Sequence, residues 1–233
     1  MTKLLFLLFL FIGLSKGLSE GEEEAYWRRQ NERNLNTRQT LPYQTIVTLS
    51  DFRSGSTLFV DKLNGCRGDM VLELFGDIPV PTYQQFVDRL ERGGKFLKVQ
   101  RVEFYRHYPF ISYYLKHHHH DRSSLLIVIL ERKVVLEQYY SWKNLENARK
   151  NPQAFRGVNL AHGMSAEQKR DLGVSVNLVD YQAYRRMTET YFQDLRELCY
   201  YEDLNCVHVY YEELEHLENV AGHSLACQSK VVG

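Results

Sequence analysis

A short run of polar residues around a glycine follows the first strand-like segment of this chain. The run is Arg53-Ser54-Gly55-Ser56-Thr57. Glycine lets the backbone approach an anion closely, and serine and threonine hydroxyls add hydrogen-bond donors. If a helix begins here, its first N–H groups point at the same place and its dipole favours negative charge. These residue types predict an anion-binding turn, and an ordinary helix start capped by Ser or Thr is the alternative.

The turn differs from the phosphate-binding loop of nucleotide-triphosphate kinases. That loop needs a lysine directly after its last glycine, and Ser56 stands there in this chain. A P-loop-like nucleotide or sugar kinase, which would depend on Mg²⁺, is therefore the weaker prediction.

A second group of polar residues follows the most apolar segment of the chain, LLIVIL at 125–130. Arg132 and Lys133 come directly after it, and Ser141 stands eight residues beyond Lys133. Eight residues are a little over two helical turns, so Ser141 and a basic residue can face one ligand. Arginine binds phosphate in a bidentate manner, and the sequence leaves open whether Arg132 or Lys133 does so. An exposed, charged helix start is the alternative.

The two groups, in this order, resemble the cofactor-binding elements of sulfotransferases that use 3′-phosphoadenosine 5′-phosphosulfate (PAPS). In that family the first turn holds the 5′-phosphosulfate, and a basic residue with a serine eight positions later holds the 3′-phosphate. The resemblance implies these roles for 53–57 and for Arg132 or Lys133 with Ser141. It covers roughly residues 44–220 and implies an enzyme that uses PAPS and needs no metal. A late Tyr-Glu-acidic-Leu motif of the family is similar to residues 211–214.

Sulfuryl transfer to a hydroxyl is an in-line displacement that needs charge stabilisation and a general base. Glu73 is the first candidate base, because it is the only acid in the apolar segment 70–75 and the family places a glutamate there. A water-facing Glu73 on an edge strand is the alternative. His107 is the second candidate, since histidine titrates near neutral pH, and a surface histidine is its alternative. Lys98 could reach the sulfonate or the acceptor.

The histidine run 117–120 predicts a solvated helix end rather than a metal site. Four consecutive side chains cannot all face one ion, and only Asp121 adjoins them as a further ligand type.

Strand-like and helix-like segments alternate, which predicts an α/β fold of three layers with a mainly parallel sheet. The domain is expected over 43–233. Its weakly periodic segment 151–175, which includes His162, is expected to be a surface loop placed where an acceptor lid would lie. The expected strands are 45–50, 70–75, 95–100, 125–130 and 206–211, and the expected helices start near 56 and 82 and span 133–149 and 176–199.

The N-terminal residues 1–18 predict a signal peptide. Lys3 precedes an apolar run of eleven residues from Leu4 to Leu14, short of the roughly 17–25 that span a bilayer. A short membrane anchor is the alternative, and either one predicts export to the Golgi lumen or to the outside. The polar segment 19–42 is expected to be a linker or stem.

Export permits disulfides, and four cysteines allow three pairings. Cys199 and Cys206 are seven residues apart across a helix-to-strand turn and are the expected pair, which leaves Cys66 and Cys227.

The composition favours a globular protein that does not bind nucleic acid. The chain has 233 residues, 44% hydrophobic, with 29 basic and 29 acidic side chains. Nucleic-acid binders carry a basic excess. The expected partners are PAPS and a hydroxyl acceptor on a glycan, glycolipid or protein tyrosine. A non-enzymatic secreted binding protein on a degenerate sulfotransferase fold is the other alternative, because after Leu217 only 228–230 could close over the cofactor.

Overall fold

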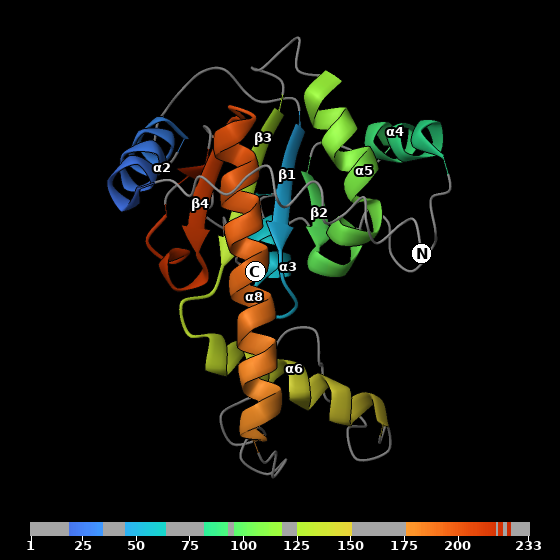
Figure 1. Ribbon diagram of the computed structural model, residues 1–233, viewed down its shortest axis with the longest axis vertical. Coiled ribbons are helices and arrows are strands. Elements are labelled where there is room, and N and C mark those ends of the chain that lie inside the picture. Colours follow the sequence, from blue (N-terminus) through green and yellow to red (C-terminus); the bar gives the residue numbers. More distant parts are fainter. Residues whose placement is uncertain are drawn as a thin grey trace, which may run out of the picture.

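A four-stranded parallel sheet forms the centre of the molecule (Figure 1). The computed structural model describes residues 19–34, 45–63, 82–92, 96–117, 125–150, 176–217, 219–220 and 223–224. The sheet has the order β2-β1-β3-β4, and all its neighbouring strands are parallel. Its strands are β1 (Thr45–Ser50), β2 (Phe96–Gln100), β3 (Leu125–Glu131) and β4 (Cys206–Tyr210).

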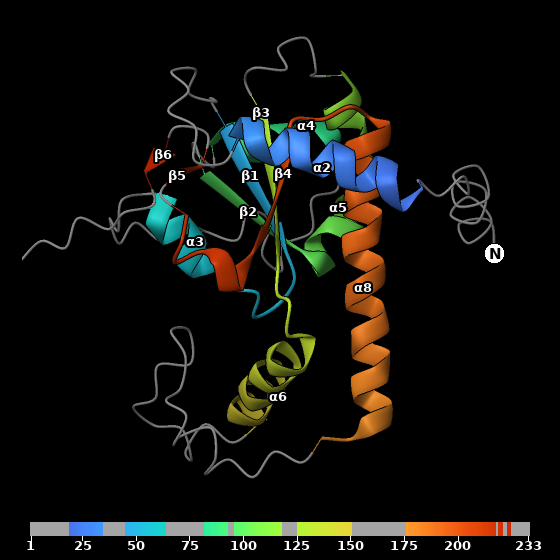
Figure 2. The same cartoon turned by 90° about the vertical axis from the view of Figure 1, so that its left-hand side faces the viewer.

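Helices cover both faces of the sheet, so that the central strand β3 is buried on both sides (Figure 2). On one face, α3 (Ser56–Leu63) packs Phe59 against Ile46 and Val128. On the other face Ile127 and Tyr191 belong to a core shared by four helices. These helices are α2 (Glu20–Asn34), α4 (Tyr83–Arg92), α5 (Arg101–His117) and α8 (Leu178–Tyr201). The predicted α/β fold is confirmed.

The helix α6 (Val135–Lys150) lies beyond the carboxyl ends of the strands instead of covering a face (Figures 1 and 2). It packs there against the first half of α8, which is longer than the strands and reaches past the edge of the sheet. The space just outside the strand ends is therefore bordered by α6 and α8.

The predicted strands at 45–50, 95–100, 125–130 and 206–211 are confirmed to within a residue at each end. No helix is predicted over most of α5, whose interior contains Pro109, a residue that disfavours a helix. The described part of the chain also contains a 3₁₀ turn (Tyr211–Glu213) and a two-stranded ribbon, β5 (Asn219–Val220) with β6 (His223–Ser224). The predicted strand 70–75, the loop 151–175 and the N-terminal segment 1–18 lie outside the described residues.

The polar composition of residues 19–42 predicts a linker. Residues 20–34 instead form the packed helix α2. Tyr26 and Trp27 are 6% and 8% exposed and lie in the core beside β4. These two aromatic side chains are buried, and most other positions of α2 are charged or polar. This gives the sequence no helical periodicity of apolar residues from which a packed helix would be predicted.

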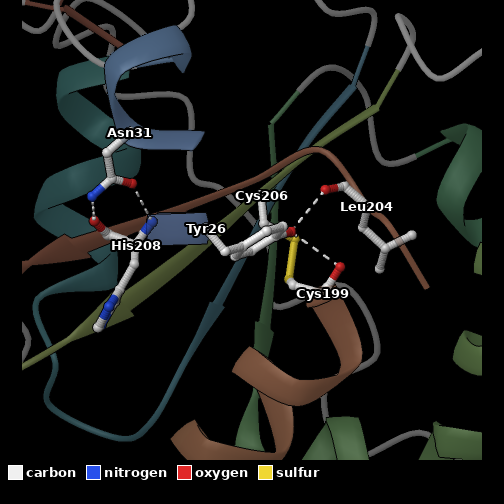
Figure 3. Close-up of a disulfide and its surroundings, with 6 residues drawn as sticks. All are labelled: Tyr26, Asn31, Cys199, Leu204, Cys206 and His208. Atoms are coloured by element: carbon white, nitrogen blue, oxygen red, sulfur yellow. Dashed lines mark hydrogen bonds between the residues drawn. A yellow bond between two sulfur atoms is a disulfide. The ribbon is translucent and has the colours of Figure 1, made fainter. Parts of the chain in front are cut away.

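Hydrogen bonds fix α2 to the edge strand β4. The side-chain amide of Asn31 donates to the carbonyl of His208 at 3.1 Å and accepts from its N–H at 3.0 Å, as a neighbouring strand would (Figure 3). The Tyr26 hydroxyl donates to the carbonyl oxygens of Cys199 and Leu204, at 3.1 and 3.2 Å. Side chains of α2 therefore satisfy main-chain groups that an open sheet edge would leave to water.

The predicted disulfide between Cys199 and Cys206 is confirmed. It joins the end of α8 to the start of β4, with the Cα atoms 6.2 Å apart (Figure 3). Cys66 and Cys227 lie outside the described residues. Within the described ranges, no helix combines the length and the apolar composition needed to cross a membrane.

If α2 belongs to the folded core, Tyr26→Phe should lower the free energy of unfolding by about 1 kcal/mol, because two buried carbonyls lose their shared donor. Urea unfolding under oxidising conditions measures this change. The matched control is Tyr140→Phe, which removes the hydroxyl of a tyrosine exposed on α6. Equal stability of Tyr26→Phe, Tyr140→Phe and the parent protein would contradict the docking of α2.

Candidate functional site

The turn between β1 and α3 holds the predicted anion-binding residues at the carboxyl edge of the sheet. Arg53 and Gly55 both have left-handed backbone conformations, with φ of 61° and 84°. Ser54 is buried, and its N–H and hydroxyl both donate to the Asp51 carbonyl, at 3.3 and 2.8 Å. Ser56 begins α3 and is buried. As at any helix start, the N–H groups of this first turn have no carbonyl partner within the helix and are available to an anion.

Only glycine fits at position 55, because its backbone conformation is left-handed and because an aromatic ring occupies the place of a Cβ. A Cβ added at this position would lie 2.1 Å from the Cδ2 atom of Tyr211, a residue that follows β4. The sequence suggested a glycine that lets an anion approach. The structure shows in addition that this glycine makes room for the Tyr211 ring.

The buried carboxylate of Asp51 holds the start of the turn. It is 0% exposed and accepts from the N–H of Phe52 at 2.7 Å and from the Thr188 hydroxyl at 2.9 Å. It also forms an ion pair with Arg101, 3.0 Å away, at the start of α5. Burial raises the pKa of Asp51, while the Arg101 charge and the two hydrogen bonds oppose that rise. Sequence reasoning missed this residue, although a carboxylate directly after a buried strand was a signal for it.

Two side chains of α6 grip the same turn. Gln138 donates through Nε2 to the carbonyl of Phe52 at 2.7 Å. Arg53 donates through Nε to the hydroxyl of Ser141 at 2.8 Å. The structure therefore brings together Arg53 and Ser141, which the sequence places in different predicted motifs.

Arg132 lies on the same side of the turn as Arg53. Its guanidinium stacks over the ring of Tyr211, 4.9 Å from the centroid, and that ring contacts Gly55. Its Nη2 donates to Glu137 at 2.6 Å. Burial lowers the pKa of Arg53, the positive charge of Arg132 lowers it further, and Tyr211 opposes this.

Lys133 points away from this group. Its side chain is 48% exposed and pairs with Glu213, 2.5 Å away, over the ring of Tyr210. Of the two basic residues that the sequence left open, Arg132 is the one that lies near the turn.

The other predicted site residues are spread over the molecule. His107 is 2% exposed and lies in the middle of α5. Lys98 is buried on β2 beside Thr48, on the face of the sheet that α3 covers. Glu73, His162 and most of the 117–120 run lie outside the described residues. In the part of the chain that the structure describes, no three His, Cys, Asp or Glu side chains gather as a metal would require.

Comparison with protein-family models, curated proteins and solved structures finds no match to this chain. The fold and the site define an α/β protein with a parallel sheet whose carboxyl edge carries arginine, carboxylate and hydroxyl side chains.

Replacement of Gly55 by alanine should destabilise the protein by at least about 2 kcal/mol, because a Cβ is strained at positive φ and meets the Tyr211 ring. Adding Tyr211→Ala to this variant should restore the part of the lost unfolding free energy that the clash with the ring causes. A double-mutant cycle in urea unfolding measures this coupling. Additivity of the two changes within about 0.5 kcal/mol would show that the ring does not lie against Gly55.

His107 should make the stability depend on pH. Burial and the charges of Arg106 and Arg89 lower its pKa below the ordinary value of 6.5. The unfolded chain therefore binds the proton first, so the free energy of unfolding should fall as the pH drops below about 6.5, by at most about 1.4 kcal/mol per pH unit from this group. In His107→Asn the fall between pH 6.5 and 5 should be shallower. Parallel curves of unfolding free energy against pH would contradict this origin.

Proposed function

We propose that the carboxyl edge of the sheet binds PAPS and that the protein is a PAPS-dependent sulfotransferase of the secretory pathway. The observation that carries the proposal is that the turn after β1 has two basic neighbours: Arg53 donates to Ser141, and Arg132 stacks on the Tyr211 ring that lies against Gly55. Two guanidinium groups and a serine hydroxyl supply the charged and neutral donors that bind an anionic group.

The residues at this edge fit a nucleotide that carries two separate anionic groups. The first N–H groups of α3 and Arg53 would receive the 5′-phosphosulfate, and Arg132 with Ser141 would receive the 3′-phosphate. Among the described residues, the Oε1 of Gln138 is buried without a hydrogen bond, and the Nε of Arg132, also buried without one, lies 3.8 Å from Glu212.

The chain would supply positioning and charge stabilisation. Arg53 and the N–H groups of α3 point to where negative charge builds on the leaving 5′-phosphate oxygen, and fixed donors of this kind are the main source of rate in such transfers. Glu73 remains the proposed general base that takes the proton of the acceptor hydroxyl. His107, buried in α5, is the weaker candidate. The proposed acceptor is a hydroxyl of a glycan, glycolipid or protein tyrosine.

Calorimetric titration with 3′-phosphoadenosine 5′-phosphate in the absence of Mg²⁺ tests the proposal. Arg132→Ala should weaken binding at least tenfold, because a charged hydrogen-bond partner of the ligand is lost. Lys133→Ala is the matched control and should stay within about twofold of the parent protein, since Lys133 points to Glu213.

Other outcomes contradict the proposal. Binding that is unaffected by Arg132→Ala would place the nucleotide elsewhere. Binding of ATP with Mg²⁺ alone would favour a kinase. No binding of either nucleotide would favour a binding protein on a degenerate fold.

A further inference from the structure

The 3₁₀ turn after β4 contacts the basic turn after β3 through all three of its side chains. Tyr211 lies under the guanidinium of Arg132, and Glu213 pairs with Lys133. Glu212 lies 3.8 Å from the Nε of Arg132 and, unlike the other two, also accepts from main-chain N–H groups.

Glu212, in the 3₁₀ turn after β4, binds the two residues that directly precede α6. Its Oε2 accepts from the N–H of Lys133 at 3.0 Å, and its Oε1 accepts from the N–H of Val134 at 3.3 Å. N–H groups at the start of a helix have no intrahelical partner, and the helix dipole adds attraction for a carboxylate. One side chain therefore satisfies two main-chain donors and ties α6 to β4.

The position of α6 matters for the anion site because two side chains of this helix form hydrogen bonds to the turn after β1. Gln138 and Ser141 hold the turn after β1. Arg132 directly precedes the two residues whose N–H groups Glu212 binds. A shift in the start of α6 would therefore move Arg132 and Ser141 away from Arg53 together.

We propose that Glu212 is the positioning residue of the anion site: its carboxylate fixes the turn between β3 and α6 so that Arg132 and Ser141 face Arg53. The inference rests on the proposed function, since it names what prepares that site for a 3′-phosphate. A carboxylate near an anion site is unfavourable in itself, but both oxygens of Glu212 accept from main-chain N–H groups. Within the described ranges Glu213 binds the side chain of Lys133, and this half-exposed pair is screened by water.

The test compares two nucleotides in three variants. Glu212→Ala should lower the affinity for 3′-phosphoadenosine 5′-phosphate at least tenfold. It should lower the affinity for adenosine 5′-phosphate, which lacks the 3′-phosphate, about threefold or less. Glu212→Gln keeps one acceptor oxygen and should recover part of the loss. Glu213→Ala is the matched control and should bind both nucleotides as the parent protein does.

If Glu212→Ala lost affinity equally for the two nucleotides, the role of Glu212 would be merely structural. If its affinities were unchanged, Glu212 would have no role in the site. Either result overturns the inference. Amide hydrogen exchange over 133–138 provides a readout without ligand. It should be faster in Glu212→Ala and unchanged in Glu213→Ala, and equal exchange in both would overturn the inference. If the parent protein binds no 3′-phosphoadenosine 5′-phosphate, the proposed function fails by itself, and this exchange still decides whether Glu212 holds α6.

Discussion

The buried ion pair between Asp51 and Arg101 is the constraint on which the carboxyl edge depends. A carboxylate that is fully removed from water needs every available donor, and this one receives them from Arg101, Thr188 and the N–H of Phe52. Such a pair adds little net stability, but the loss of one partner costs about 3–5 kcal/mol because the other charge stays buried. The pair therefore determines where β1, α5 and α8 meet, and with them the path of the turn.

The rest of the site follows from that fixed turn. Two residues of the turn have left-handed conformations. The side chain of Arg53 reaches Ser141, and Gly55 leaves space for the Tyr211 ring. Tyr211 in turn supports Arg132. Arginine side chains thus meet at one edge of the sheet, where Asp51 pairs with Arg101 and Glu137 pairs with Arg132. These arginine side chains, rather than the composition, are the physical basis for proposing an anionic nucleotide.

The sequence predicts the parts of this structure that depend on local pattern. The unbroken apolar run of β3 indicates a strand buried on both faces, and the short spacing of Cys199 and Cys206 indicates their disulfide. Other features depend on distant partners. The choice between Arg132 and Lys133 is made by which carboxylates they meet, and α2 docks through hydrogen bonds to residues about 175 positions away. No spacing along the chain reveals such contacts, and the binding roles at the carboxyl edge stay predictions.

A crystal structure of the protein with 3′-phosphoadenosine 5′-phosphate would test the central claim most directly. The account predicts one phosphate within hydrogen-bond distance of the Arg132 guanidinium and of Ser141, and the other at Arg53 and the first N–H groups of α3. Lys133 should remain paired with Glu213. A nucleotide bound away from the turn between β1 and α3, or an empty carboxyl edge at saturating nucleotide, would contradict the account.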